Sequence, residues 1–267
     1  MLSVGIIGLG TIGSVVANAL DKGIAGMALK AVASGRQEKA LAALATLSSP
    51  TELMSIDAVA KCCDIVVDCA PKSVFRDIAE AALTRGRTLV TVSGAGILAN
   101  ADIETMARDH GGQVILATGA LLGLDAVRAA SEGAINSVRM ITRKPPNALR
   151  DAPHIVDNNI NLDGLNGATR VFSGSAREGA MAFPANVNVA AALGLAGVGA
   201  DATQLEVWAD PHLDRNTHAI EVDADSARFT LNIENVQSPE NPGTGKITAL
   251  SVIACLRGMT APMKIGS

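Results

Sequence analysis

The chain has 267 residues, enough for one large domain or two small ones. Hydrophobic residues make up 48% of it and aromatic residues only 2%, so the core must be built from Ala, Val, Leu and Ile. The formal net charge of -4 and the scarcity of stacking aromatics argue against a nucleic-acid partner. An anionic substrate would therefore have to be held by local groups.

Signals for export, membrane insertion or metal binding are missing from the sequence. The N-terminus lacks a basic n-region, and the longest apolar run, 187–200, is shorter than the about 20 residues of a membrane span. We therefore expect a soluble, cytoplasmic protein with no membrane partner. The cysteines form no C-x-x-C pair, and no histidine stands at metal-ligand spacing from them, so we expect buried thiols, no disulfide and no metal. These cysteines are Cys62, Cys63, Cys69 and Cys255.

The first predicted element is a short apolar strand, residues 3–7, followed by a glycine-rich turn and a helical pattern. The turn reads Gly8-Leu9-Gly10-Thr11-Ile12-Gly13, and strand, G-x-G-x-x-G and helix in this order are the dinucleotide-binding fingerprint. Gly8 allows the tight turn, Gly10 lets the backbone approach a pyrophosphate, and Gly13 lets the helix pack close to the strand. The helix start would face the phosphates. The coenzyme contacts expected in this turn are Gly8, Gly10, Thr11, Ile12 and Gly13.

Strand and helix patterns alternate through the first half of the chain, which predicts a doubly wound parallel sheet. One helix begins near Pro71 and ends at Gly86, and another covers 101–110. Ligands of such sheets bind at the carboxyl ends of the strands. The further strands are expected at 27–33, 64–68, 88–93 and 113–118. The coenzyme contacts expected after them are Ser34, Arg36, Ala70, Pro71, Ser93 and Gly94.

The end of the second predicted strand bears on which coenzyme binds, NAD or NADP. A carboxylate about 20 residues beyond the fingerprint would bind the ribose of NAD, but the chain reads Ala33-Ser34-Gly35-Arg36 there. Arg36 could hold the 2′-phosphate of NADP, or it could be a solvated arginine at a helix start. The expected coenzyme is therefore NAD or NADP.

The pattern changes after about residue 120 to one typical of an α+β domain. Several strands alternate apolar and polar residues, as in a half-buried antiparallel sheet. A capping box, Ser175-Ala176-Arg177-Glu178, begins one helix, and an Ala/Gly-rich helix follows Asn188. The remaining helices are expected at 124–131 and 246–257, a loop at 239–245, and strands at 137–142, 169–173, 204–209, 217–223 and 227–236.

The sequence thus predicts an α/β protein with two domains. Residues 1–120 form a Rossmann domain, a doubly wound parallel sheet, which 243–267 complete as the last helix returns to it. Residues 121–242 form an α+β domain for substrate binding and dimerisation. The density of small residues in 187–200 suits close packing, so we expect a homodimer in which this helix and the sheet supply the interface.

His218 is the candidate acid/base among four histidines. It shares a strand face with Ile220 and Val222, which is typical of a core histidine, but it also starts a strand and could face a cleft. An imidazole that titrates near neutrality suits amine or carbonyl redox chemistry. Arg177, Lys144 and Lys72 are candidate anchors for a substrate carboxylate, with a surface charge as the alternative.

Several segments together resemble the L-aspartate dehydrogenase family. The similarity spans essentially the whole chain, and the segments after residue 118 are more specific than the fingerprint. They are Gly8–Gly13, Ser93–Gly96, Thr118-Gly119-Ala120-Leu121-Leu122-Gly123-Leu124-Asp125-Ala126, Gly174–Glu178, Phe183-Pro184-Ala185-Asn186-Val187-Asn188-Val189-Ala190-Ala191 and Asn216-Thr217-His218.

The resemblance implies a function. Ala120 and Asn188 match residues that contact the dinucleotide in the family, and His218 matches its catalytic acid/base. The implied reaction converts L-aspartate, water and NAD(P)+ into oxaloacetate, ammonia and NAD(P)H through iminoaspartate. Some relatives are thought to supply iminoaspartate to NAD biosynthesis.

Two alternatives stay open. One is a related reductase such as dihydrodipicolinate reductase or homoserine dehydrogenase, although the former carries a His-His pair and no adjacent histidines occur here. The other is a non-catalytic dinucleotide sensor whose second domain serves dimerisation or partner binding.

Overall fold

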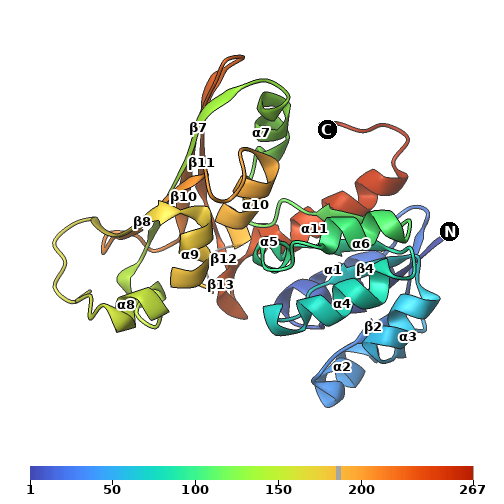
Figure 1. Cartoon of the computed structure of the whole chain (residues 1–267). Coiled ribbons are helices and arrows are strands. Elements are labelled where there is room, and N and C mark those ends of the chain that lie inside the picture. The colour runs from blue at the N-terminus through green and yellow to red at the C-terminus, as the bar shows by residue number, and fades with distance from the viewer. Residues whose placement is uncertain (185–187, 267) are drawn as a thin grey trace. The chain divides into compact units, whose positions relative to one another are not determined.

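The computed structural model describes residues 1–184 and 188–266, which form two compact units. The first unit comprises Met1–Ala117 with Thr248–Ile265, and the second is built on Thr118–Ile247. Each is described by itself below (Figure 1).

The first unit contains a six-stranded sheet in which every pair of neighbours is parallel. Its strands are β1 (Leu2–Ile7), β2 (Met27–Ala33), β3 (Glu52–Leu53), β4 (Ile65–Asp68), β5 (Thr88–Thr91) and β6 (Gln113–Leu116). The order β3-β2-β1-β4-β5-β6 is that of a Rossmann sheet and confirms the predicted doubly wound fold. The predicted strands 88–93 and 113–118 end two residues early, and the two-residue β3 was too short to produce a pattern.

Helices cover both faces of this sheet. They are α1 (Thr11–Asp21), α2 (Gln37–Leu44), α3 (Ile56–Cys62), α4 (Phe75–Leu83), α5 (Gly94–Leu98), α6 (Ile103–Asp109) and α11 (Lys246–Thr260), with a 3₁₀ turn at Lys72–Val74. One core joins Val16 of α1 and Val252 of α11 to β1, and a second joins Val59 of α3 and Ile78 of α4 to β4 and β5. The predicted return of the last helix to the first domain is thereby confirmed.

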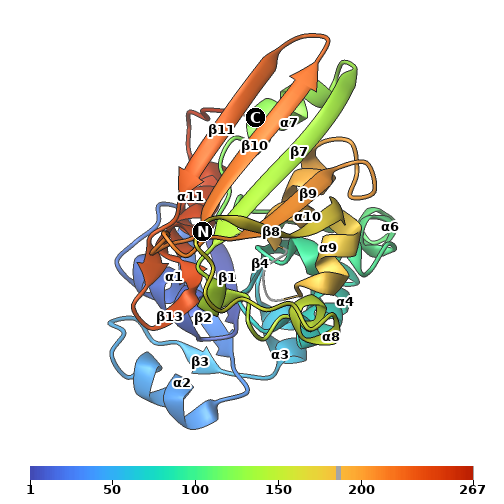
Figure 2. The same ribbon diagram turned by 90° about the vertical axis from the view of Figure 1, so that its left-hand side faces the viewer.

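The second unit contains a mixed five-stranded sheet, not the purely antiparallel one expected. Its strands are β7 (Ile135–Lys144), β8 (Thr169–Ser175), β9 (Gln204–Ala209), β10 (Thr217–Ala224) and β11 (Arg228–Glu234), and its helices are α7 (Leu124–Ser131), α8 (Pro153–Asp157), α9 (Ala176–Ala182) and α10 (Asn188–Ala196). The order is β11-β10-β7-β9-β8, and Figure 2 shows β11, β10 and β7 side by side. β7 and β9 pair in parallel because the connection between them crosses over through α9 and α10.

One face of this sheet is buried and the other is open. Along β7 and β10 the even-numbered residues from 138 to 144 and from 218 to 224 are buried, and most of the odd-numbered ones are partly exposed. Small residues of α10 and just after it pack within the unit: a Cβ on Gly194 would stand 2.8 Å from Cα of Ala200, and one on Gly197 3.1 Å from Cγ1 of Val127. Close internal packing accounts for these small residues, and the expected role of this helix in a dimer interface stays a prediction. The predicted loop 239–245 is also wrong, since β12 (Gln237–Ser238) and β13 (Asn241–Gly245) form a hairpin there.

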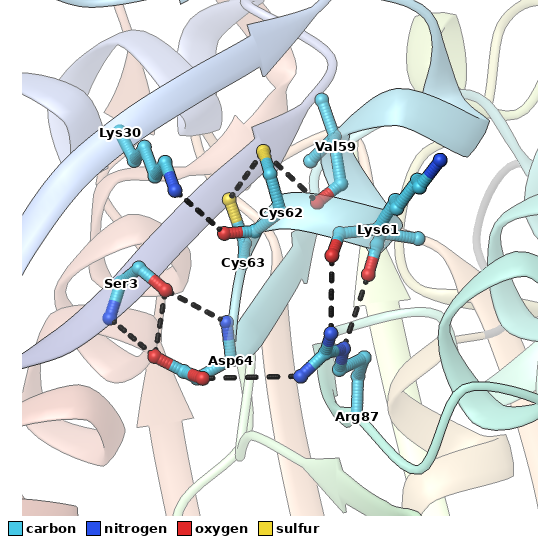
Figure 3. Close-up of polar contacts among 9 residues, drawn as sticks. Ser3, Lys30, Val59, Lys61, Cys62, Cys63, Asp64 and Arg87 are labelled. Atoms are coloured by element: carbon cyan, nitrogen blue, oxygen red, sulfur yellow. Dashed lines mark hydrogen bonds and ion pairs between the residues drawn. The ribbon is translucent and has the colours of Figure 1, made fainter.

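The amino ends of the parallel strands are held by a polar network that also anchors α3 (Figure 3). Ser3 N and Oγ donate to Asp64 Oδ2 at 2.8 and 2.6 Å. Arg87 Nε and Nη2 donate to the carbonyls of Ala60 and Lys61, and Lys30 Nζ donates to that of Cys62. These cations bind the carbonyl groups that a helix leaves unpaired at its C-terminus.

The thiols beside this network are structural. Cys62 and Cys63 have their Sγ atoms 3.7 Å apart and both are free. Burial, with the Cys62 hydrogen bond, raises the pKa of Cys63 to about 12, so its thiolate is suppressed at neutral pH. Across residues 1–184 and 188–266, no group of three or more His, Cys, Asp or Glu side chains could hold a metal ion, and no helix is long and apolar enough to cross a membrane.

Candidate functional site

The glycine turn after β1 has the shape that a bound dinucleotide requires. Gly8 has φ +93°, and a Cβ there would stand 2.6 Å from the carbonyl oxygen of Cys69. A Cβ on Gly13 would collide with the carbonyl oxygen of Gly8. Among the described residues, only Arg36 comes within 4 Å of a Cβ on Gly10, with its Nη2 at 3.6 Å. Gly8 and Gly13 are thus required by internal packing, whereas Gly10 leaves space beside the backbone.

The start of α1 is prepared for an anion. Gly10 is its N-cap residue, no side chain caps the helix, and no acidic residue lies in its first turn, Thr11–Gly13. The first N–H groups of a helix have no intrahelical partners, so they and the positive end of the helix dipole can bind phosphate oxygens. These residues therefore fit the pyrophosphate of a dinucleotide.

Arg36 lies beside this turn, at the carboxyl end of β2. Its backbone N–H donates to Ser34 Oγ at 3.3 Å, and it is the N-cap residue of α2. Its side chain is exposed and reaches Gly10 as described above. The structure thus brings together the turn and the guanidinium that the sequence singled out.

The loops after β4 and β5 are joined by a buried carboxylate that the sequence analysis missed. Asp68, the last residue of β4, accepts from Ala70 N at 3.1 Å and from Thr91 Oγ1 at 2.8 Å. Thr91 Oγ1 in turn accepts from Ser93 N at 2.9 Å. Burial raises the pKa of Asp68 to about 6, although the Thr91 and Ala70 hydrogen bonds oppose this. The sequence did contain a signal for this carboxylate, namely an acidic residue at the end of an otherwise apolar strand.

This network places the remaining predicted coenzyme contacts of the first unit at one edge of the sheet. Pro71 precedes the 3₁₀ turn that leads into α4, and Gly94 is the first residue of α5. Both loops follow neighbouring strands, since Asp68 and Thr91 are paired in the sheet.

In the second unit, His218 lies on the buried face of the sheet, opposite Thr142 of β7. Its Nδ1 is 3.1 Å from Thr142 Oγ1, and the two residues are each only 4% exposed. Lys144 follows two residues after Thr142 on the same face and is 5% exposed. The sheet therefore gathers a base, a hydroxyl and an ammonium in a water-poor environment.

The electrostatics of this group differ from the near-neutral histidine expected from the sequence. Burial, with the positive charge of Lys144, lowers the pKa of His218 to about 3. Burial lowers the pKa of Lys144 to about 8. In the free protein at neutral pH, the imidazole is thus uncharged while Lys144 still carries most of its charge, because desolvation penalises the charged form of both groups.

Ala120 lies near the same end of the sheet. Asn235, just after β11, donates from Nδ2 to the Ala120 carbonyl at 3.3 Å and from its backbone N to the Asn216 carbonyl at 2.9 Å. Asn216 immediately precedes β10. Ala120 and Asn216 both lie in segments that resemble the family, although they are far apart in the sequence. Asn235 links the two segments through these two hydrogen bonds.

The other predicted contacts lie at helix starts. Arg177, in the first turn of α9, donates to both carboxylate oxygens of Asp201, from Nε at 2.5 Å and from Nη2 at 2.9 Å. The Arg177 guanidinium is thus paired with Asp201 in a partly exposed ion pair, whereas Lys144 is 5% exposed. Asn188 is the exposed first residue of α10. The preceding residues of that motif, 185–187, lie outside the described part of the chain.

Comparisons with known proteins cover both units of the chain. The model of the family described as aspartate dehydrogenase, C-terminal, matches residues 125–259, and that of homoserine dehydrogenase, NAD binding domain, matches residues 8–117. The L-aspartate dehydrogenase of Bradyrhizobium diazoefficiens is 53% identical over 100% of this chain and 94% of its own length. L-aspartate dehydrogenase 3 of Bordetella bronchiseptica is 46% identical over 100% of this chain and 98% of its own length.

A solved structure shares the fold over its full length. The crystal structure of aspartate dehydrogenase from Thermotoga maritima matches with a TM-score of 0.75 at 22% identity, covering 100% of both chains. The homoserine dehydrogenase of Thiobacillus denitrificans matches with a TM-score of 0.63 at 16% identity, covering 97% of this chain and 73% of that one. Full-length identity with curated relatives decides between these related groups: the chain belongs to the L-aspartate dehydrogenase family.

Proposed function

We propose that this protein oxidises L-aspartate with NAD or NADP. L-Aspartate and NAD(P)+ give iminoaspartate, NAD(P)H and a proton, and water then converts iminoaspartate into oxaloacetate and ammonia. The observation that carries the proposal is the buried group of His218, Thr142 and Lys144, in a chain whose full-length relatives are named L-aspartate dehydrogenases.

His218 is the proposed catalytic base. A hydride can leave Cα only when the nitrogen lone pair is free to form the imine, so the substrate ammonium must first lose a proton. The imidazole is uncharged in the free protein and can accept that proton. The substrate carboxylates add negative charge beside the ring, which raises the pKa of His218 at the moment when it must act as a base. Thr142 Oγ1 fixes the ring through Nδ1.

Lys144 is the proposed anchor for a substrate carboxylate. Its ammonium is buried at a cost in free energy, as the lowered pKa shows. A carboxylate that arrives beside it offsets this cost through a charge-assisted hydrogen bond. The net charge of -4 repels a dianionic substrate, so a buried local cation is the group that such a substrate needs.

The coenzyme site is proposed to be the edge of the first unit formed by the glycine turn and the two joined loops. The nicotinamide coenzyme supplies the hydride acceptor when bound. The chain's own residues hold it: the main chain of Gly8–Gly13 binds the pyrophosphate, Ser34 and Arg36 the adenosine ribose, and Ala70, Pro71, Ser93 and Gly94 the remainder. We include Ala120 and Asn188 of the second unit among the dinucleotide contacts.

The first prediction concerns the reaction and His218. The wild-type protein should reduce NAD or NADP with L-aspartate, and more slowly with L-glutamate, L-asparagine or L-homoserine, in a coenzyme-reduction assay. His218→Asn should lower kcat by about 10²–10⁴-fold, the usual effect of losing a general base. Its coenzyme dissociation constant should stay unchanged. Coenzyme binding without turnover of any amino acid would instead identify a sensor, and near-wild-type turnover of His218→Asn would exclude this residue as the base.

The second prediction concerns the charge of Lys144. Succinate, a non-reacting dicarboxylate, should inhibit most strongly while Lys144 is protonated, below its pKa of about 8. The inhibition constant should rise above that pH, approaching about tenfold per pH unit, because binding then requires uptake of a proton. In Lys144→Met the inhibition constant should be larger, and the rise that begins near pH 8 in the wild type should be absent. A wild-type constant that does not change across this range would contradict the assignment.

The third prediction concerns coenzyme choice. Arg36→Asp should raise KM for NADP much more than KM for NAD, because the new carboxylate repels a 2′-phosphate and can accept from a 2′-hydroxyl. Lys39→Asp makes a matched control, since Lys39 is an exposed cation of the same helix, α2. Equal effects of Arg36→Asp on both coenzymes would show that Arg36 does not lie at the 2′ position.

We also propose that the protein is a homodimer formed through the open face of the second sheet. This face carries charges of both signs: Arg139 donates to Glu206 at 2.9 Å and to Glu221 at 3.4 Å. The cross-strand pair Ile141 and Ala219 lies partly exposed on the same face. A two-fold interface brings the same patch of two copies together. A patch with positive and negative side chains around an apolar centre can then pair each charge with an opposite charge of the second copy.

The fourth prediction tests this interface. Light scattering at micromolar concentration should give twice the chain mass of 27.2 kDa for the wild type. Ala219→Glu should give the monomer mass, because two carboxylates would be buried unpaired at the centre of the interface. Leu250→Glu, an equally charged change at an exposed position of α11, should leave the dimer intact. A wild-type mass near 27.2 kDa would refute the proposal.

A further inference from the structure

Asn216 carries a buried acceptor that the protein does not satisfy. Its side-chain Oδ1 is inaccessible to solvent, yet no donor among the described residues binds it. Leaving a buried acceptor without a hydrogen bond costs about 1–3 kcal/mol, so such atoms are rare in native proteins and call for an explanation.

The position of Asn216 places this acceptor in the proposed substrate site. At the start of β10, Thr217 pairs with Arg143 of the antiparallel β7. The residue before Thr217, Asn216, is therefore level with the residue after Arg143, Lys144. Strand alternation puts Asn216 on the same face as His218, two residues on. Register and alternation thus place Asn216 beside His218 and Lys144, the proposed base and the proposed anchor.

The backbone of Asn216 is held firmly at this level of the sheet. Its carbonyl accepts from Asn235 N at 2.9 Å, which continues the β10–β11 ladder beyond its last pair, Thr217 with Glu234. Asn235 is itself tied to the Ala120 carbonyl through Nδ2. The acceptor therefore has a defined location, and a missing partner there points to a ligand that brings a donor.

We propose that Asn216 Oδ1 accepts a hydrogen bond from an N–H of the substrate's α-nitrogen, and that it is a positioning residue selecting amino acids over hydroxy acids. This inference rests on the proposed function. An amide oxygen repels a carboxylate and has no proton to give, so of the groups of an acidic amino acid only the nitrogen can satisfy it.

The chemistry explains the selectivity. The α-ammonium gives one proton to His218, the Cα–H bond breaks as hydride leaves for the coenzyme, and the nitrogen lone pair forms the C=N bond. The resulting iminium keeps two N–H bonds, so one can donate to Asn216 Oδ1 throughout. A hydroxy acid gives its only O–H proton to His218 and becomes a carbonyl. Two acceptor oxygens would then face each other, and Oδ1 would be unsatisfied in the transition state.

The test compares ligands that differ only at this nitrogen. Asn216→Leu removes the acceptor and keeps the branching of the side chain, and Asn232→Leu, at an exposed position of β11, is the matched control. For Asn216→Leu we expect kcat/KM for L-aspartate to fall about ten- to hundredfold, as for loss of one buried hydrogen bond. The inhibition constant of succinate, which has no α-nitrogen, should not change. Turnover of L-malate relative to L-aspartate should rise.

Stability and coenzyme binding separate this role from others. The thermal midpoint of Asn216→Leu should not fall, because Oδ1 has no hydrogen bond to lose in the free protein. A lower midpoint, or equal losses with L-aspartate and succinate, would overturn the proposal in favour of a structural role. A weakened coenzyme dissociation constant would overturn it in favour of the coenzyme's carboxamide as the donor. Failure of the wild type to oxidise L-aspartate would be a different result and would refute the proposed function itself.

Discussion

The register of β10 against β7 is the constraint on which the proposed chemistry depends. Because side chains alternate along a strand, a slip of β10 by one residue would move His218 to the open face, away from Thr142 and Lys144 of β7. The pairing of His218 with Thr142 is one of a continuous series in which Ile220 faces Met140 and Val222 faces Val138. The apolar pairs thus hold the polar pair in place.

Burial of this group sets its charges. In water, the imidazole and the ammonium would both have ordinary pKa values, but on this sheet desolvation lowers the pKa of each, and the charge of Lys144 lowers that of His218 further. The protein therefore holds an uncharged base beside a cation and an unsatisfied amide oxygen. In the proposed complex, the substrate ammonium supplies a donor for that oxygen, and the substrate carboxylates supply negative charge beside the cation.

The first unit is organised by a different buried group. Asp68 ends β4 with a carboxylate that joins Ala70 to Thr91, and through Thr91 to Ser93. Two loops on neighbouring strands are thus fixed relative to each other within this unit. The glycine turn needs no such support, since Gly8 and Gly13 have no room for a side chain. The proposed coenzyme site thus combines a turn set by close backbone packing with two loops held by hydrogen bonds.

The sequence by itself determined what depends on local order: the fingerprint of Gly8–Gly13, the alternation that predicts the parallel sheet, and the place of His218 on an apolar strand face. Only the tertiary structure decided which residues meet. Thr142 and His218 are far apart in sequence, and their pairing is set by register. Burial distinguishes Lys144 from Arg177, which Asp201 engages at the surface. The unsatisfied oxygen of Asn216 and the parallel pairing of β7 with β9 likewise follow from long-range packing, which no local pattern encodes.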